Sequence, residues 1–548
     1  MLPRIAVHCV FVMVLVFNSK YVWAEKINEK LFPSLNYVYD LDQMELQGRS
    51  LQILNKPKGI DMKLVNFIKS NISSKTNMPY SFSIHPEKRM EIYEKMGESH
   101  FANDVIERTI VEEGLIVYDG AVGQIVLAMI GGEDNLKQAQ HPVNVYWSGE
   151  LNNLWNIRAG YPINQFIYDP KNPELVSSDL KRKGERGFIF RIINANGEYV
   201  NSDPLDGKTH LEGFPTQERI HWEDWKPVAG ENAWVAMAAL HLYHKKYYDE
   251  LLEQYEYVED SVELKLAKEL ARAALILQTE TGGVRMAPIG TYRNPKDFVD
   301  PDMLQGHWWY NQISAENNIS WYAAMRMLYQ ITQEEKYKVS MKGIEKFFKD
   351  VWDAEKGYFH QGMNYVKGHW ILSTDHFALD VQTWGLIAFG PQMIDEWLGI
   401  GASFNLWKRS KELSGAYDQY GKFIGVGYIE EHDRVSVEWT AGAIMAARIV
   451  GEYYEDENFE WSQLAVMDAD SMRSGIESLR QPLSDTKEAY SYSSRRGWIP
   501  FGWNSHDPEV VSLASTGWVL FVDSNFNPFE LPNSLDLKKD QLVYREKR

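Results

Sequence analysis

Apolar residues along this chain form two kinds of segment, and these predict two kinds of helix. Segments of the first kind begin with a polar or acidic residue and continue as a run of Ala, Gly and bulky apolar residues on every side of the helical turn. Six such segments occur, and they begin near Val117, Ala229, Ile313, Ala378, Ser436 and Ala514. Because a helix that is apolar all round has no face suited to solvent, we expect these six to be fully buried.

Segments of the second kind lie between the first. Residues 261–278 and 334–352 carry one apolar stripe and one charged face, which is typical of a helix packed on one side only. Buried helices that alternate with amphipathic helices six times predict two concentric rings. We therefore expect an all-α fold, a toroid of six inner and six outer helices. The spacing of the inner segments is unequal, so the repeat carries insertions and is not a solenoid.

The remaining segments give the domain organisation. Residues 25–105 are expected to be a lead-in that packs on the toroid and adds a helix to the outer ring, and the toroid itself spans 106–525. A large insertion, about 142–225, contains an alternating stretch around residues 194–197 that predicts a small β-hairpin. The tail, 526–548, is polar and is expected to drape over the surface.

Residues 1–24 have the features of a secretory signal. A positively charged start precedes a 13-residue apolar stretch and a small residue, Ala24, at the expected cleavage point. An uncleaved membrane anchor is the alternative. The single cysteine, Cys9, lies in this segment, so the exported chain can form no disulfide. This favours a bacterial periplasmic or secreted protein, with no membrane segment after cleavage.

Composition narrows the choice of partners and cofactors. At 548 residues, with 44% hydrophobic and 24% charged residues, the chain can bury a large core. Its net charge of −19 disfavours a nucleic acid partner, because phosphate binding relies on basic surface. The spacing of a metal or dinucleotide motif is absent. We predict a monomer without a metal or other cofactor; a Ca²⁺ bound in a loop stays open as the alternative.

Acidic residues head five of the six inner segments. They are Asp119, Glu231, Glu316, Asp380 and Glu438, and the sixth segment has Ser515 at this place. One acid in a first turn needs no function, because the helix dipole and capping stabilise it by about 0.3 to 1 kcal/mol. Five at the shared mouth of a ring would repel one another unless a ligand or a reaction uses them. We therefore interpret them as a functional pocket.

With these six polar-headed segments, the chain resembles the six-hairpin glycosidase superfamily. Its members are (α/α)6 toroids, among them many inverting glycoside hydrolases, phosphorylases and some polysaccharide lyases. The resemblance covers about residues 105–525. It implies a carbohydrate substrate and, as in most members, inversion at the anomeric carbon.

Glycoside cleavage gives the acids distinct roles. One carboxylic acid protonates the leaving oxygen, and a second carboxylate activates water or attacks the sugar. In a ring of six, the second position faces the fifth, so Glu231 with Glu438 is the leading catalytic pair. Glu316 with Asp380 is the reserve pair. Burial beside tryptophans would raise the pKa of the general acid, against the effect of a helix N-terminus.

Aromatic and polar residues near the inner segments are the expected substrate contacts. Flat rings beside short polar groups suit the two sides of a sugar, although ordinary core packing is the alternative for each ring. The expected binding residues are Asp119, Trp222, Trp308, Trp309, Tyr310, Asn317, Trp384, Arg496 and Trp503. The sequence thus predicts an exported, inverting glycoside hydrolase acting on an oligo- or polysaccharide.

Two other functions stay open. A toroidal polysaccharide lyase would use Tyr or His as base and Arg to neutralise a uronate, and residues 490–498, YSYSSRRGW, contain such groups. A glycan-binding toroid without catalysis is the other, since a fold does not determine a function.

Overall fold

A computed structural model describes residues 59–97, 110–148, 150–151, 155–156, 188–189, 191–196, 228–287, 309–501 and 503–532. All of these belong to one compact unit, residues 58–548. The predicted signal, residues 1–24, lies outside the described residues, as does most of the predicted insertion. Within the described ranges, no helix combines the length and apolarity that a membrane span needs.

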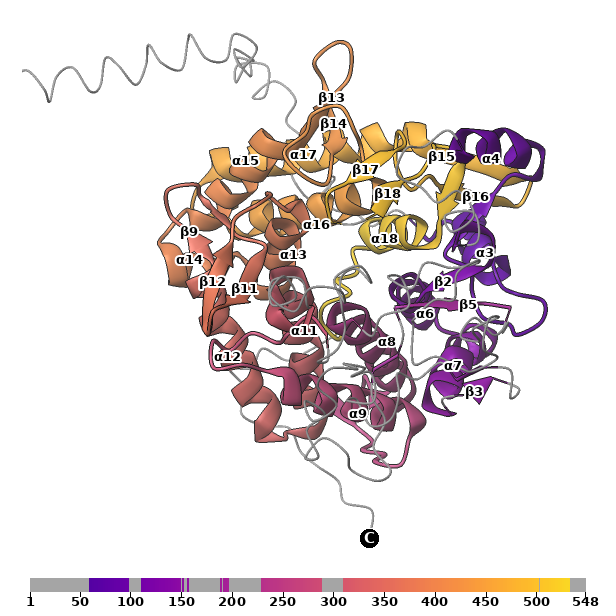
Figure 1. The fold of residues 1–548 in the computed structure, drawn as a ribbon, viewed down its shortest axis with the longest axis horizontal. Helices are drawn as coiled ribbons and strands as arrows, with labels where there is room; N and C mark the ends of the chain where they lie inside the picture. Colours follow the sequence, from indigo (N-terminus) through magenta and orange to yellow (C-terminus); the bar gives the residue numbers. More distant parts are fainter. Residues whose placement is uncertain are drawn as a thin grey trace, which may run out of the picture. The chain divides into compact units, whose positions relative to one another are not determined.

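Six buried helices form a closed inner ring (Figure 1). They are α6 (Val117–Ile130), α8 (Ala229–Tyr247), α11 (Ala315–Thr332), α13 (Leu379–Phe389), α16 (Val437–Tyr453) and α18 (Leu513–Ser524). Each packs on the next in this order, and α18 packs on α6. All eleven residues of α13 are buried, as expected for a helix that is apolar on every side. The predicted (α/α)6 toroid is confirmed.

Amphipathic helices surround this ring. They are α7 (Glu133–Ser148), α9 (Val262–Leu277), α12 (Glu335–Asp350), α14 (Pro391–Leu398) with α15 (Ala402–Ser414), α17 (Phe459–Ile476) and α3 (Met62–Ser70). Each packs on an inner helix, and α3 takes its place against α18, at the other end of the described chain. α7 continues through Pro142, so the helix extends beyond the expected start of the insertion. The remaining helical segments are α4 (Arg89–Gly97), η2 (Pro86–Lys88), η8 (Trp309–Asn311) and η9 (Glu477–Leu479).

Short antiparallel strands join the helices. The pairs are β1 (Phe82–Ile84) with β19 (Val510–Ser512), β2 (Gly114–Ile116) with β5 (Ile192–Asn194), β3 (Glu150–Leu151) with β4 (Trp155–Asn156), β6 (Tyr248–Asp249) with β7 (Gln254–Tyr255), β9 (Trp352–Asp353) with β10 (Tyr358–Phe359), β13 (Gly415–Tyr417) with β14 (Phe423–Val426), β15 (Arg480–Ser484) with β16 (Lys487–Tyr490) and β17 (Gly497–Ile499) with β18 (Trp503–Ser505). A three-stranded sheet has the order β12 (His369–Ser373), β11 (Gly362–Val366), β8 (Gln312–Ser314). Strand β5 lies where the first arm of the hairpin is predicted, but within the described residues it pairs with β2. The second arm, after residue 196, lies outside the described residues.

The C-terminal segment corrects one prediction. After α18 the chain turns back into the ring, where Phe529 and Leu531 are 0% and 1% exposed. The ring of His241 on α8 hydrogen-bonds the carbonyl of Pro528 at 2.8 Å, and Arg326 on α11 donates to the carbonyl of Phe529 at 3.0 Å. The prediction that the tail drapes over the surface is therefore wrong for residues 526–531. Their apolar side chains fill the ring at the end away from the helix N-termini.

Candidate active site

Five of the six inner helices share a register that is set by their fourth residues. The fourth residue of α11, Asn318, accepts a hydrogen bond from the N–H of Val284 at 2.7 Å and donates to its carbonyl at 3.0 Å. The fourth residue of α13, Gln382, binds both groups of Phe359 in the same way, at 2.9 Å each. Equivalent contacts join Asn232 to Ile189, Thr440 to Val426 and Thr516 to the N–H of Tyr490.

This register separates the predicted acids into two sets. Glu316, Asp380 and Glu438 are second residues of their helices, whereas Asp119 and Glu231 are third residues. Adjacent residues of an α-helix point about 100° apart. The five acids therefore do not occupy equivalent positions, contrary to the prediction. The other second residues are Tyr118, Gly230 and Ala514.

The second residues face the axis of the ring. The hydroxyl of Tyr118 on α6 donates to Oε1 of Glu438 on α16 at 2.6 Å, although α18 lies between these helices. Such a contact is possible only if both side chains reach into the lumen. Glu316, Asp380 and Glu438 thus lie on three consecutive helices along one side of the lumen. The opposite side carries the small residues Gly230 and Ala514.

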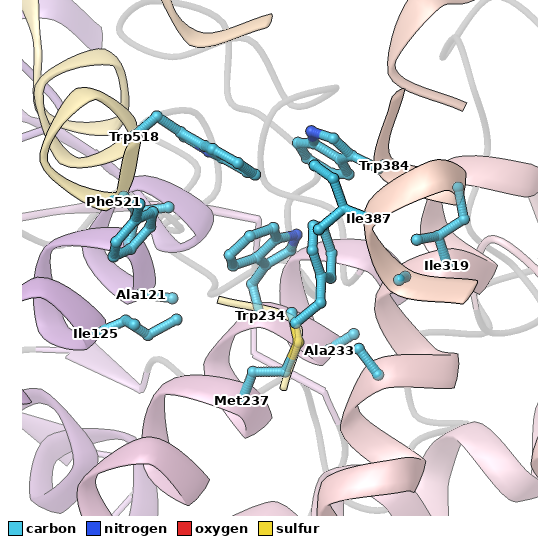
Figure 2. Packing of buried hydrophobic residues seen from close by; sticks show 14 of the residues in the cluster. Ala121, Ile125, Ala233, Trp234, Met237, Ile319, Trp384, Ile387, Trp518 and Phe521 are labelled. Atoms are coloured by element: carbon cyan, nitrogen blue, oxygen red, sulfur yellow. The ribbon is translucent and has the colours of Figure 1, made fainter. Parts of the chain in front are cut away.

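Three tryptophans form a floor below the carboxyls. Trp234, Trp384 and Trp518 are the sixth residues of alternate inner helices, one turn beyond the second residues and on the same face. Their ring centroids are 5.4 to 5.9 Å apart, and Figure 2 shows the three rings gathered between the helices. The intervening sixth residues, Val122, Ser320 and Gly442, are small. Beneath the floor, Phe529 packs on all three indoles. This apolar floor closes the lumen directly beneath the acids.

Burial raises the pKa of all three axial carboxyls. It raises the pKa of Glu438 to about 7, although the hydrogen bond from Tyr118 opposes the rise. It also raises the pKa of Asp380 to about 7, against a hydrogen bond from the N–H of Val381. The pKa of Glu316 lies well above its ordinary value, first because of burial and second because of the charge on Asp380. All three carboxyls are thus shifted toward keeping a proton at neutral pH.

Tyr118 is fixed by two hydrogen bonds. Its oxygen accepts a hydrogen bond from the indole N–H of Trp518 at 2.7 Å, and its hydroxyl donates a hydrogen bond to Glu438. Burial first, and the charge of Glu438 second, hold the pKa of Tyr118 well above its ordinary value. The phenol is thus a neutral donor to Glu438 over the physiological pH range.

The two third-residue acids have other surroundings. Arg191 Nε lies 2.8 Å from Glu231 Oε1, so this carboxylate is ion-paired. Asp119 is 4% exposed, and burial raises its pKa well above the ordinary value. Neither lies in the axial group, but both lie near it. The charge of Glu231 contributes to the raised pKa of Glu316, and the charge of Glu438 contributes, after burial, to the raised pKa of Asp119.

The expected binding residues are dispersed. Asn317 is buried between α11 and α8, where a Cβ at Gly230 would lie 2.2 Å from its Oδ1, and Trp384 belongs to the floor. Trp503 donates its indole N–H to Tyr492 at 2.9 Å, and the charges of Glu438 and Asp119 raise the pKa of Tyr492, after burial. Trp503 thus contacts a tyrosine, Tyr492, that lies close enough to Glu438 and Asp119 to sense their charge.

Three other expected residues lie in local clusters. Trp309 packs in a small core with Val228, Tyr310 lies under the guanidinium of Arg285 at 4.1 Å, and Arg496 lies 3.9 Å from Asp507. Trp222 and Trp308 lie outside the described residues. No group of three or more His, Cys, Asp or Glu within the described ranges is arranged to hold a metal ion.

Sequence reasoning missed Tyr118, Trp234 and Trp518. A polar residue four places into every inner helix except α6, which has Gly120 there, could have found the two tryptophans but not Tyr118. Counting back two places from Asn318, Gln382 and Thr440 gives an acid, whereas counting back from Asn232 and Thr516 gives Gly230 and Ala514. Counting forward two places from Asn232, Gln382 and Thr516 gives the three tryptophans of the floor.

Comparisons with known proteins give fold similarity only. No protein-family model and no curated protein sequence matches the chain. Among solved structures it is similar to a sugar epimerase from a ruminal bacterium, with a TM-score of 0.49, 10% identity and coverage of 86% of this chain and 97% of that one. It is also similar to a cellobiose 2-epimerase from Bacillus thermoamylovorans, with a TM-score of 0.48, 11% identity and coverage of 84% of this chain and 95% of that one. For a GH76 α-mannanase from Bacteroides thetaiotaomicron, the TM-score is 0.44 and the identity 11%, and the match covers 89% of this chain and 98% of that one.

Proposed function

We propose that this protein is a carbohydrate-active enzyme that hydrolyses a glycosidic bond, with Glu316 as general acid and Glu438 as general base. The observation that carries the proposal is the axial group of carboxyls above a tryptophan floor, with pKa values displaced toward neutrality. Groups with perturbed pKa values in a cleft are candidates for catalysis. A general acid and a general base both work best with a pKa near the operating pH.

The surroundings support this division of roles. Glu316 has a pKa well above the ordinary value, so it keeps a proton to give to a leaving oxygen. Glu438 accepts a hydrogen bond from the Tyr118 hydroxyl at one oxygen, which favours its ionised form and leaves the second oxygen for water. Asp380 lies between them in the ring and is assigned to a sugar hydroxyl.

The spacing of the helices is compatible with inversion. Packed helices lie about 8 to 10 Å apart, so α11 and α16, separated by α13, lie about 14 to 17 Å apart in a regular ring. Two glutamates reaching toward the axis would leave several ångströms between them, on the scale of the roughly 6.5 to 9.5 Å that inverting enzymes use to hold water. Glu231 is ion-paired with Arg191 and lies outside the axial group, so we assign it a supporting role in place of its predicted catalytic role.

The lyase alternative has less support. A lyase base must lose its proton, whereas the tyrosine that touches the carboxyls has a raised pKa. Arg191 is ion-paired with Glu231, and Arg434 with Glu431 at 3.2 Å, so these two are already engaged by carboxylates. Three axial carboxyls would also repel a uronate.

A screen with matched variants tests the proposal. Neutral α- and β-linked glucans and mannans and uronate polymers are screened for new reducing ends and for absorbance at 235 nm, and NMR follows the anomer first formed. On the active glycan, Glu316→Gln and Glu438→Gln should each lower kcat/KM by about 10² to 10⁴, whereas Glu231→Gln should cost far less.

Three results would contradict the assignment. Growth of the 235 nm absorbance in step with the new reducing ends would establish a lyase, because β-elimination leaves an unsaturated uronate at one new end and a reducing sugar at the other, without adding water. Epimerised or isomerised sugar without bond cleavage would place the same carboxyls in proton transfer at carbon. Full activity of both axial variants would remove Glu316 and Glu438 from catalysis.

A further inference from the structure

We propose that Phe529, in the C-terminal segment, is a positioning residue for Glu438 that acts through the tryptophan floor. The proposal rests on the proposed function for its catalytic consequence. Its physical basis is independent of that function, because it concerns how one buried segment holds three indole rings.

Phe529 packs on all three floor tryptophans from below. Its ring centroid lies 5.2 Å from Trp234, 5.5 Å from Trp384 and 6.1 Å from Trp518. The side chain is 0% exposed. Interiors are close-packed, so removing a ring of this size leaves a cavity into which neighbours relax. Here the neighbours are the floor itself.

Backbone contacts hold Phe529 in place. Arg326 on α11 donates one Nη to the carbonyl of Phe529 at 3.0 Å and the other to Ala388 of α13 at 2.9 Å. The N–H of Phe529 donates to Asn527 at 3.0 Å, and His241 of α8 holds the preceding carbonyl. Two inner helices, α8 and α11, thus hold the segment, and it in turn can hold the floor in place.

The floor is connected to the acid by two hydrogen bonds in series. Trp518 donates its indole N–H to Tyr118 at 2.7 Å, and Tyr118 donates to Glu438 at 2.6 Å. A phenol has one proton. While the indole N–H occupies a lone pair of the oxygen, the proton is directed at Glu438. A shift of the Trp518 ring would release the phenol to turn, and Glu438 would lose a donor that favours its ionised form.

An ordinary core role for Phe529 makes different predictions. Loss of a core contact lowers the amount of folded protein, but the molecules that fold keep their pH dependence. Loss of a positioning contact changes the environment of the tryptophans and the ionisation of Glu438 in protein that is still folded. The near-UV circular dichroism of the indoles and the pH profile of kcat/KM distinguish the two roles.

The experiment compares four variants of the full chain on the active glycan. Phe529→Leu and Phe529→Ala shorten the side chain that packs beneath the floor, and Tyr118→Phe removes the hydroxyl that donates to Glu438. The matched control is Phe526→Leu, since Phe526 is in the same segment but packs on Phe521 and His241 at 5.6 and 5.3 Å. Urea unfolding confirms that each variant is folded before activity is measured.

Both Phe529 variants should reduce the near-UV signal of the floor, and Phe526→Leu should not. Losing a hydrogen bond to a charged group is worth about one pH unit or more. The acid limb of kcat/KM should therefore move up by about one unit in Tyr118→Phe and in the same direction in Phe529→Ala, with about a tenfold loss below the limb and little loss above it.

An unchanged near-UV signal in Phe529→Ala would overturn the proposal. So would an unmoved acid limb in that variant when Tyr118→Phe moves it, and in this case the proposed function would stand. An unmoved limb in Tyr118→Phe would instead remove Glu438 as the base, and the proposal would fail with it.

Discussion

At the scale of single residues, one position along a helix decides what a side chain can do. Tyr118 and Asp119 are consecutive, yet Tyr118 reaches across the lumen to Glu438 and Asp119 does not. The same holds for Gly230 and Glu231, where the acid turns to Arg191. The acids were visible in the sequence, but the axial set was not. A first turn favours acids at several positions through the helix dipole, so an acid alone does not determine the register.

The buried carboxyl of Glu438 should make stability depend on pH. Burial raises its pKa from 4.5 in the unfolded chain to about 7 in the folded protein, so the folded state retains a proton that the unfolded chain has released between these values. Below pH 4.5 the carboxyl is protonated in both states and does not lower the free energy of unfolding. As the pH rises, it lowers the free energy of unfolding increasingly, and this loss levels off above about pH 7 at about 3 kcal/mol.

Glu438→Gln should therefore stabilise the protein at pH 8 by up to about 3 kcal/mol and much less at pH 5, because glutamine stays neutral and can still accept from Tyr118. Urea unfolding at both pH values measures the difference. Glu231→Gln is the control: it leaves Arg191 without its carboxylate and should lower stability at pH 8. An equal effect of Glu438→Gln at both pH values would show that the folded carboxyl titrates normally.

At the scale of elements, a buried amide or hydroxyl fastens the start of each of five inner helices to the segment before it. Sequence patterns predicted the helices well, since runs such as that in α13 are apolar on every side. They did not predict the fastening contacts, because Asn318 and Gln382 bind backbone groups of Val284 and Phe359, 34 and 23 residues away in sequence. Long-range pairs of this kind leave no local pattern.

Replacing one of these amides should destabilise the whole ring. Asn318→Leu has a similar volume but leaves the buried N–H and carbonyl of Val284 without their partner, which should cost about 2 to 4 kcal/mol. Gln140→Leu is the control, because that amide pairs with Asn144 at the surface of α7 at 3.0 Å. Urea unfolding measures both, and a loss below about 0.5 kcal/mol in Asn318→Leu would show that the amide does not fasten α11.

At the scale of the whole molecule, the chain must bring distant segments together to close the ring. Inner and outer rings were predictable because each helix shows its burial in its own composition. The burial of the tail was not predictable, because its apolar residues are isolated in a polar sequence: Phe526, Phe529 and Leu531. Only a ring that has already formed gives them a place to pack. The closing contact between α18 and α6 was likewise hidden, since it depends on the shape of two facing surfaces.

That contact offers a sharp test of closure. A Cβ added at Gly517 of α18 would lie 2.4 Å from Cγ1 of Val122 on α6, so the two helices can approach only because this residue is glycine. Gly517→Ala should cost about 1 to 3 kcal/mol by overpacking, despite the higher helix propensity of alanine. Val122→Ala removes the clashing methyl, so the double variant should be more stable than the sum of the single effects by about 1 to 3 kcal/mol.

Gly123→Ala provides the matched control on the same seam. Its added Cβ would lie 3.4 Å from Leu513, an ordinary contact, and the change should be nearly neutral or slightly stabilising in the helix. Urea unfolding of the four chains gives the coupling energy directly. Additive losses in the Gly517 and Val122 variants would mean that the ring relaxes without strain at this seam. A positive coupling energy, with Gly123→Ala tolerated, would show that one methyl group decides how closely the last inner helix can meet the first.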